Sequence, residues 1–325
     1  MRTVLVSGAS GIVGYGSLRS LRKRGQELRL LGTSIYSDSV APAFCDQFVL
    51  APPTNAPGYM DWLEATIRQH QVDLIIPGIE VDMYKWDEHR DQIQAAGAKS
   101  LLNNAKLIDL CRDKWLFYEN LAAAQIGCAI SSSLSQDFGE LCAQFGLPFL
   151  LKPRNGFGSK GIVRVHSRED YLPHMQFVGR ILMVQPIVGI DEEEYTASAF
   201  GDGRGGVVAC MTLKRRLSKD GFTEKAVVVS NGLFAATIAE LAAHFKPLGP
   251  TNFQFRLCSD GAKLLEINPR VSSSTAIRTA FGYNECAMAV DFFLNGSMPS
   301  QPMIQNGHAV RYTDECIFYE TGIHI

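Results

Sequence analysis

The sequence lacks any apolar run of the length that crosses a membrane, and the segment TVLVSG near its amino terminus is typical of a buried strand, not of a secretion signal. It also lacks an excess of charge of one sign. The net charge is −2, whereas a protein built to bind polyanions needs basic stripes. These absences argue against a membrane protein and against a nucleic-acid partner, and they favour a cytoplasmic protein.

Paired metal-ligand motifs are missing as well. The eight cysteines include no C-x-x-C pair, and the seven histidines include no H-x-x-x-H pair. The sequence therefore indicates neither a zinc site nor a disulfide framework. With 46% hydrophobic and 20% charged residues the composition is that of a globular protein, and 325 residues exceed what one small core organises. Two or three packed units are expected.

The first unit alternates strand-like segments (3–7, 28–31, 72–77) with helix-like segments (from after Gly14 to about Arg24, and 62–70), which predicts a parallel, doubly wound sheet. Its G-x-x-G-x-x-G loop is similar to a dinucleotide-binding turn. Such a site needs an acidic residue near the end of the second strand, where this chain has Thr33 and Ser34. We therefore interpret the loop as a helix-preceding turn that faces the active site, with an NAD(P) site as the less favoured alternative.

Glu80 and Asp82 follow the strand at 72–77, at the edge where open parallel sheets bind their ligands. Two carboxylates at this place could hold a substrate amine. They could equally favour the start of the helix at 83–89, because acidic side chains stabilise helix N-termini. The sequence leaves both interpretations open.

Residues 252–275, NFQFRLCSDGAKLLEINPRVSSST, predict a β-hairpin with a three-residue loop at 259–261. Counting outward from the loop predicts one polar face with the pairs Cys258–Ala262, Arg256–Leu264, Gln254–Glu266 and Asn252–Asn268. The same count places Phe253, Phe255, Leu257, Leu265 and Ile267 on the apolar face. The alternative for the polar face is a merely solvated sheet surface.

The polar face gathers oxygen donors of the kind that Mg²⁺ takes, namely Gln254, Glu266 and Asn268. Pro269 then ends the strand ladder and Arg270 follows it, ahead of a serine-rich start to a helix. A guanidinium fork and a helix N-terminus both attract anions. The segment thus predicts a metal site beside an anion site.

The order Q-x(n)-G-x(n)-E-x-N-P-R-x-S-x-S in this segment resembles the metal-binding strand pair and substrate arginine of the ATP-grasp enzymes, especially their carbamoyl-phosphate-synthetase and amino-acid-ligase branches. The resemblance implies that Gln254, Glu266 and Asn268 bind two Mg²⁺ ions, with Mn²⁺ as an alternative. Glu266 would bridge the two ions. The catalytic residues implied here are Arg270, which would hold an acyl-phosphate, and Asn268.

Two further segments match the ATP-grasp positions that hold nucleotide phosphates. Asp113 predicts a helix N-cap, and the resemblance places the next residue, Lys114, on the phosphates. Residues 149–165 predict a strand, a glycine loop and a strand, and K-P-x-x-G-x-G-S-x-G is similar to the ATP-grasp lid loop. That similarity implies phosphate contacts from Lys152, Gly156, Gly158, Ser159 and Gly161. A plain mobile hairpin loop is the alternative.

By the same resemblance, residues 181–194 join the lid to the last unit and enclose the adenine. The backbone of Gln185 and Val188 would contact the base, and Glu194 would hold the ribose hydroxyls. Family members often have Glu at the position of Gln185, but a backbone contact does not depend on that side chain. The choice of Glu194 among four successive acids depends on the match to E-Y-T.

Lys214 and Arg216 follow the predicted strand at 207–213. Because alternate residues share a face, both side chains are expected to point into the cleft, where cations suit a transferring phosphoryl group. Arg216 is our candidate catalytic residue, since it matches an arginine common in the family ahead of a glycine such as Gly221. A solvated run of charge is the alternative.

We therefore expect an α/β and α+β protein with three parts. They are an N-terminal doubly wound parallel sheet (1–108), an ATP-grasp lid (109–184) and an antiparallel, metal-bearing part (185–325). The resemblance implies an ATP- and Mg²⁺-dependent ligase that joins a small carboxylate to an amine through an acyl-phosphate, with a homodimer left open. The alternatives are carboxyphosphate chemistry like that of carbamoyl-phosphate synthetase, ATP sensing without turnover and, third, a Rossmann oxidoreductase.

Overall fold

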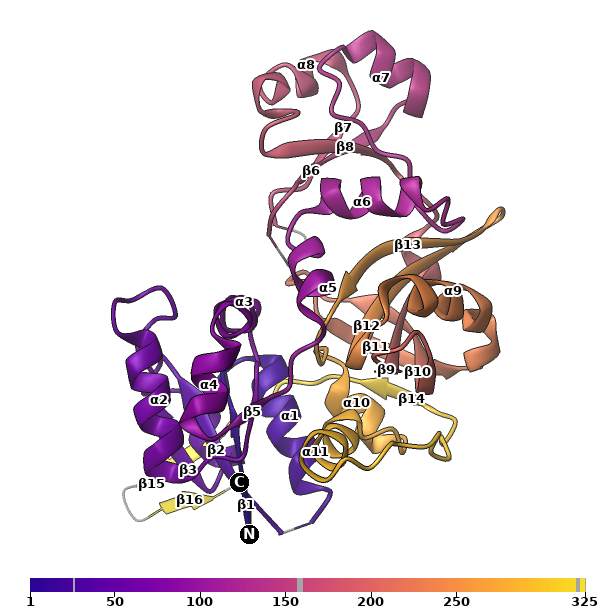
Figure 1. The fold of residues 1–325 in the computed structure, drawn as a ribbon. Helices are drawn as coiled ribbons and strands as arrows, with labels where there is room; N and C mark the ends of the chain where they lie inside the picture. Colours follow the sequence, from indigo (N-terminus) through magenta and orange to yellow (C-terminus); the bar gives the residue numbers. More distant parts are fainter. Residues whose placement is uncertain (26, 157–159, 320–321, 325) are drawn as a thin grey trace.

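The first part of the molecule is a five-stranded parallel sheet of order β3-β2-β1-β4-β5 (Figure 1). Its strands are β1 (Arg2–Val6), β2 (Leu28–Ser34), β3 (Gln47–Leu50), β4 (Leu74–Ile76) and β5 (Lys99–Ser100). The computed structural model describes residues 1–25, 27–156, 160–319 and 322–324. The predicted parallel sheet is confirmed, and β3 and β5 are additions that the sequence did not reveal.

Helices cover both faces of this sheet because its buried strands alternate their side chains between two cores. Val4 and Val6 of β1 pack with α1 (Ile12–Arg22), whereas Leu5 packs on the opposite side. That opposite side carries α2 (Tyr59–His70), α3 (Glu80–Glu88) and α4 (Arg90–Ala96), while η1 (Ala41–Phe44) packs beside α1. The sheet is therefore doubly wound, as predicted.

The lid is a three-stranded antiparallel sheet of order β7-β6-β8, at the top of Figure 1. Its elements are α7 (Phe138–Phe145), β6 (Phe149–Pro153), β7 (Val163–Val165), α8 (Arg168–Tyr171), η2 (Met175–Phe177) and β8 (Leu182–Pro186). A small separate core lies between this sheet and α7. The helices α5 (Ala105–Leu110) and α6 (Lys114–Ala123) connect the first domain to the lid.

The last part is a six-stranded sheet of order β13-β12-β9-β10-β11-β14. Its strands are β9 (Glu194–Asp202), β10 (Val207–Leu217), β11 (Thr223–Val229), β12 (Leu248–Cys258), β13 (Gly261–Asn268) and β14 (His308–Val310). Every neighbouring pair is antiparallel. The shorter elements η3 (Asp191–Glu193), η4 (Asn231–Leu233), β15 (Ile317–Tyr319) and β16 (Gly322–His324) complete the chain.

Helices join the six-stranded sheet to the other two parts. On one face α9 (Ala235–Phe245) packs on a core that also includes Phe117 of α6. On the other face α10 (Thr275–Ala280) and α11 (Glu285–Asn295) lie between the sheet and α1 of the first domain (Figure 1). Arg24 also forms an ion pair of 2.7 Å with Asp291 of α11. Of the helices in the described ranges, none is long and apolar enough to cross a membrane.

The hairpin of β12 and β13 has the predicted register where it carries polar residues and a different one at its tip. Gln254 pairs with Glu266 and Asn252 pairs with Asn268, as expected. Cys258, however, pairs with Gly261, so the loop has two residues instead of three, and a β-bulge beside Gln254 restores the register. The predicted pairs Cys258–Ala262 and Arg256–Leu264 were therefore wrong. Leu264 is buried in the core in place of Leu265.

Candidate functional site

A cavity of about 1670 Å³ lies where the three sheets approach one another. The lid contributes Lys152 and Gln185 to its lining, the six-stranded sheet contributes Gln254 and Glu266, and the first domain contributes Glu80. A single small-molecule site has roughly 300–1,000 Å³. The cavity therefore has room for more than one ligand.

The predicted metal-binding residues lie together on the cavity side of β12 and β13. Glu266 Oε1 accepts a hydrogen bond of 2.9 Å from Asn268 Nδ2. Gln254 Oε1 accepts one of 2.5 Å from Arg215 Nη2. A carbonyl oxygen and a carboxylate have further lone pairs, so both side chains can still accept from or coordinate a ligand. The structure thus brings one carboxylate and two amides to a single patch.

Lysines from two elements face this patch. Burial lowers the pKa of Lys152 to about 8, although the nearby Glu266 raises it, and Lys114 lowers it further. The ammonium group of Lys114 donates to the carbonyl oxygen of Gly156 at 2.7 Å, which joins the start of α6 to the lid loop. Both lysines line the cavity, as expected for residues that would contact phosphates.

Asp113 fixes the position of Lys114. Its side chain caps α6 by accepting from the backbone N–H groups of Trp115 and Leu116, which confirms the predicted N-cap. Arg154 donates to the same carboxylate, with 2.6 Å between Arg154 Nη2 and Asp113 Oδ2. Burial alone would raise the pKa of Asp113, but these hydrogen bonds hold it below its ordinary value. The guanidinium of Arg154 therefore holds the lid against the start of α6.

The lid loop is described at its two ends. Gly156 lines the cavity, but Gly161 does not. A Cβ atom on Gly161, whose φ is +75°, would lie 3.0 Å from Cγ of Pro153, so this residue shapes the turn of the loop. Gly158 and Ser159, which we also expected to contact phosphates, lie outside the described residues.

The residues predicted to surround the adenine and ribose also line the cavity, namely Gln185, Val188 and Glu194. The side chain of Gln185 donates to Ser132 Oγ at 2.8 Å, so it ties β8 to the segment at Ser132. Both oxygens of Glu194 accept from arginines. Oε1 lies 3.0 Å from Arg215 Nη2, and Oε2 lies 3.2 Å from Arg256 Nη2. The predicted ribose contact stays a prediction.

The arginine that faces the cavity on β10 is Arg215, so the predicted orientation of Arg216 was wrong. The side chain of Arg215 is 5% exposed, whereas that of Arg216 is 70% exposed and pairs at 3.4 Å with Glu224 on the outer face. Strand alternation was correct in placing Lys214 and Arg216 together, but on the outer side. Arg215 is in phase with the buried Met211 and Leu213, and this signal in the sequence could have identified it.

Arg270 and Glu80 meet across the junction between the last part and the first domain. Nη2 of Arg270 donates to Oε1 of Glu80, and Nη1 donates to the carbonyl oxygen of Val271 at 2.8 Å. Asp82, by contrast, accepts from Thr54 Oγ1 at 2.5 Å and from the hydroxyl of Tyr59 at 2.9 Å. Burial raises the pKa of Asp82 against these hydrogen bonds.

Comparison with known proteins relates this chain to the ATP-grasp proteins. Residues 180–316 match a family described as "ATP-grasp in the biosynthetic pathway with Ter operon". The carbamoyl phosphate synthase large chain of Thermotoga petrophila is 22% identical over an alignment of 299 positions that covers 83% of this chain and 26% of that protein. Both matches indicate the ATP-grasp superfamily. The chain spans about a quarter of the length of the curated relatives it matches.

The fold of solved ATP-grasp structures agrees with this assignment. The N5-carboxyaminoimidazole synthetase of Staphylococcus aureus has a TM-score of 0.72 at 15% identity, covering 93% of this chain and 80% of that one. The biotin carboxylase domain of Hydrogenobacter thermophilus 2-oxoglutarate carboxylase has a TM-score of 0.70 at 15% identity, covering 94% and 73%. At such identities the likeness establishes the ATP-grasp fold.

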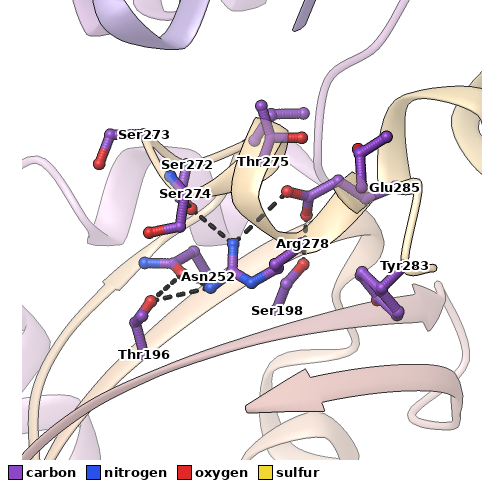
Figure 2. Close-up of polar contacts among 12 residues, drawn as sticks. Thr196, Ser198, Asn252, Ser272, Ser273, Ser274, Thr275, Arg278, Tyr283 and Glu285 are labelled. Carbon is purple, nitrogen blue, oxygen red and sulfur yellow. Dashed lines mark hydrogen bonds and ion pairs between the residues drawn. The ribbon is translucent and has the colours of Figure 1, made fainter. Parts of the chain in front are cut away.

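Sequence reasoning missed a buried polar network behind the patch formed by Gln254, Glu266 and Asn268 (Figure 2). Its centre is Arg278 of α10, which is fully buried and forms an ion pair of 3.4 Å with the equally buried Glu285. Nη1 of Arg278 donates to Ser272 Oγ at 2.6 Å, and Nη2 donates to Asn252 Oδ1 at 2.9 Å. A signal existed, because an arginine within an otherwise uncharged short helix, TAIRTA, needs a buried partner.

The network orients Asn252, which also lines the cavity. Its Oδ1 accepts from Arg278 and, at 2.6 Å, from Thr196 Oγ1. The amide nitrogen therefore points away from the guanidinium, as Figure 2 shows. The network thus fixes both the amide of Asn252 and the loop at Ser272, directly behind the pair of Asn252 with Asn268.

Proposed function

We propose that this chain is an ATP- and Mg²⁺-dependent ligase that activates a small-molecule carboxylate as an acyl-phosphate and joins it to an amine. The observation that carries the proposal is the convergence of three groups on one cavity. They are the Gln254, Glu266 and Asn268 patch, the lysines at 114 and 152, and the guanidinium of Arg270. Cationic side chains around this patch suit two anions that must approach each other.

ATP is the proposed phosphoryl donor. Lys114 and Lys152 would pair with its phosphates, the backbone at Gln185 and Val188 would contact adenine, and Glu194 would accept from the ribose hydroxyls. The lid loop residues Gly156, Gly158, Ser159 and Gly161 would cover the phosphates. The structural neighbour from Staphylococcus aureus has also been solved with ADP, and the biotin carboxylase domain with MgADP, which supports this placement.

The donor set on β12 and β13 fits a hard cation. Within the described ranges there is no cluster of three or more His, Cys, Asp or Glu side chains suited to a metal. A single carboxylate with amide oxygens instead matches Mg²⁺, which completes its coordination with water and phosphate oxygens. We propose that Gln254, Glu266 and Asn268 hold two such ions, with Mn²⁺ able to replace Mg²⁺. When bound, the ions would neutralise charge on the phosphates.

The proposed reaction needs no side-chain nucleophile. A carboxylate oxygen of the substrate attacks the γ-phosphorus of ATP, the bond to the β,γ-bridging oxygen breaks, and ADP leaves. The amine nitrogen then attacks the acyl carbon, the bond from that carbon to the phosphate oxygen breaks, and phosphate leaves while nitrogen loses a proton. Arg270 would pair with the acyl-phosphate, and Asn268 would lie beside it, so the protein positions charges and stabilises them.

A second candidate is carboxyphosphate chemistry with bicarbonate as the carboxylate. It is favoured by the relatives, which are carbamoyl phosphate synthase large chains, although this chain covers only 26% of their length. A third candidate is an ATP sensor without turnover. The cytoplasmic location and the homodimer stay predictions.

The test measures ADP release from ATP and MgCl₂ with hydroxylamine as the nucleophile, in the presence of bicarbonate, simple carboxylates or amino acids. We expect at least one carboxylate to stimulate ADP release, and Glu266→Gln to abolish the stimulation. Glu224→Gln is the matched control, because Glu224 lies on the outer face of the same sheet. Tight ATP binding without stimulated ADP release by any of these carboxylates would favour the sensor.

A further inference from the structure

The ion pair between Arg270 and Glu80 spans two parts of the molecule and 190 residues of sequence. Both side chains line the cavity, and they are only 13% and 15% exposed. An ion pair in such a place is held by more than bulk-water electrostatics, because removing one partner leaves the other partly desolvated and unpaired. A ligand that binds Arg270 in place of Glu80 must therefore also provide a partner for the Glu80 carboxylate.

The guanidinium of Arg270 is largely occupied by protein groups, so an anion can bind it only where Glu80 binds now. Nη1 is occupied by the carbonyl oxygen of Val271, and Nη2 is shared between Glu80 and, at 3.4 Å, Asn268 Oδ1. The Nε atom is buried and has no hydrogen-bond partner among the described residues. A substrate carboxylate on this guanidinium would compete directly with the carboxylate of Glu80.

Of the cations that line the cavity, the arginine near Glu80 is already paired. Arg112 lines the same region, but it pairs at 2.8 Å with Glu88, and its guanidinium carbon lies 4.4 Å from the ring centroid of Tyr84. A substrate that is only an anion would thus place two carboxylates side by side at one guanidinium, which costs free energy.

We propose that the carboxylate substrate is a zwitterion, an amino acid whose carboxylate binds Arg270 and whose ammonium group binds Glu80. Such a ligand replaces one ion pair by two and leaves neither side chain unpaired. The inference rests on the proposed function in one respect only, namely that the bound carboxylate is the group that is phosphorylated.

Glu80, and not Asp82, is the ammonium partner in this arrangement. The carboxylate of Asp82 already accepts from Thr54 and Tyr59 and is buried at 4% exposure, so it supports the first domain. Glu80 instead pairs with Arg270 and lines the cavity. In this proposal Glu80 therefore binds the substrate amine, whereas Asp82 has a structural role. The biotin carboxylase domain differs in this respect, since it has been solved with bicarbonate, an anion without a cationic group.

The test compares wild type, Glu80→Gln and the control Glu64→Gln, which removes an exposed carboxylate of the same domain from its pair with Arg68. The probes are the proteinogenic α-amino acids, their des-amino counterparts (acetate, propionate, succinate, 3-phenylpropionate) and bicarbonate. One readout is ADP release with MgATP and hydroxylamine. The other is the shift in melting temperature that each probe causes in the presence of MgADP.

We expect wild type to prefer an amino acid over its des-amino counterpart by at least about thirtyfold in kcat/KM, equal to about 2 kcal/mol. Glu80→Gln should lower kcat/KM for that amino acid by a similar factor. It should raise kcat/KM for the des-amino acid, because the competitor for Arg270 is weakened. Opposite signs in one variant cannot come from a folding defect. Glu64→Gln should change neither value.

Equal or better use of bicarbonate or a des-amino acid by wild type would overturn the zwitterion proposal and leave the ligase intact. An amino acid that raises the melting temperature through Glu80 without any ADP release would support the zwitterion site and overturn the ligase. No response to amino acids in either readout would overturn the zwitterion proposal.

Discussion

Two polar clusters lie against the same six-stranded sheet, and they differ in whether their charged groups are buried or open on the cavity. The Arg278 network is shut off from the cavity, since its guanidinium and the Glu285 carboxylate are fully buried and bind only protein groups, although Nε of Arg278 has no hydrogen-bond partner among the described residues. The patch at Gln254, Glu266 and Asn268 opens on the cavity and keeps acceptor capacity for a ligand. A closed cluster stabilises the fold, whereas an open one can bind. Asn252 belongs to the first through its oxygen and lines the cavity of the second.

The largest expected effect breaks the closed cluster. Arg278→Met should lower the free energy of unfolding by about 3–5 kcal/mol, because it leaves the buried Glu285 carboxylate without its partner. Urea denaturation measures this loss. The double variant Arg278→Met/Glu285→Met should recover part of it, since no unpaired charge remains. A single variant as stable as wild type would show that the network contributes little to the fold.

The next effect breaks the open cluster. Glu266→Gln keeps the shape of the side chain but removes the only carboxylate of the patch, so turnover should fall at least about a hundredfold. The unfolding midpoint in urea should stay close to that of wild type. ATP affinity should survive better than turnover, because Lys114 and Lys152 remain. Near wild-type ADP formation in this variant would remove the metal site from this face.

A smaller effect concerns the pH dependence of ATP binding. The pKa of Lys152 is lowered to about 8 in the free protein, and bound phosphate would favour the charged form. Above pH 8 binding must therefore take up a proton, and affinity should fall by up to about tenfold per pH unit. Titration calorimetry from pH 7 to pH 9.5 measures this slope. Lys152→Arg should flatten it, and an unchanged slope in that variant would assign the titration to another group.

Lys152 also affects stability in a direction that can be checked without ligand. Its folded-state pKa lies below the ordinary lysine value of 10.5, so the unfolded chain binds more protons between about pH 8 and pH 10.5. This group's contribution therefore makes the protein more stable as pH rises through that window. Lys152→Met should remove the contribution, as measured by urea denaturation at pH 7.5 and pH 9.5.

The smallest effect separates two adjacent arginines. Arg216→Ala should change stability and turnover little, because exposed ion pairs such as Arg216–Glu224 contribute about 0–1 kcal/mol. Arg215→Ala should weaken ATP-dependent turnover, since it leaves the buried Glu194 without one partner and frees the oxygen of Gln254. ADP release and urea midpoints for the two variants give the comparison. A larger loss in Arg216→Ala would instead make Arg216 the functional arginine of β10.

Much of the site could be predicted from the sequence because its determinants are local. The shared polar face of Gln254 and Glu266 follows from a two-residue period, and their exact pairing was correct because the bulge offsets the one-residue error in the expected loop. The Asp113 cap follows from a polar residue directly before a helix. The prediction failed at the hairpin tip, where a two-residue loop and a bulge replaced the expected three-residue loop. A bulge leaves the period intact on either side of it, so the pattern does not reveal the bulge.

The sequence by itself determined which residues share a face, which motifs could surround phosphates and which oxygens could hold a hard cation. Only the tertiary structure decided which face of β10 is turned inward, because alternation relates neighbours to each other and not to the rest of the molecule. It also decided the meeting of Arg270 with Glu80, and of Arg278 with Thr196, Asn252 and Glu285. Those contacts join segments that are distant in sequence, and they form because α10 and α11 are packed between the sheet and the first domain.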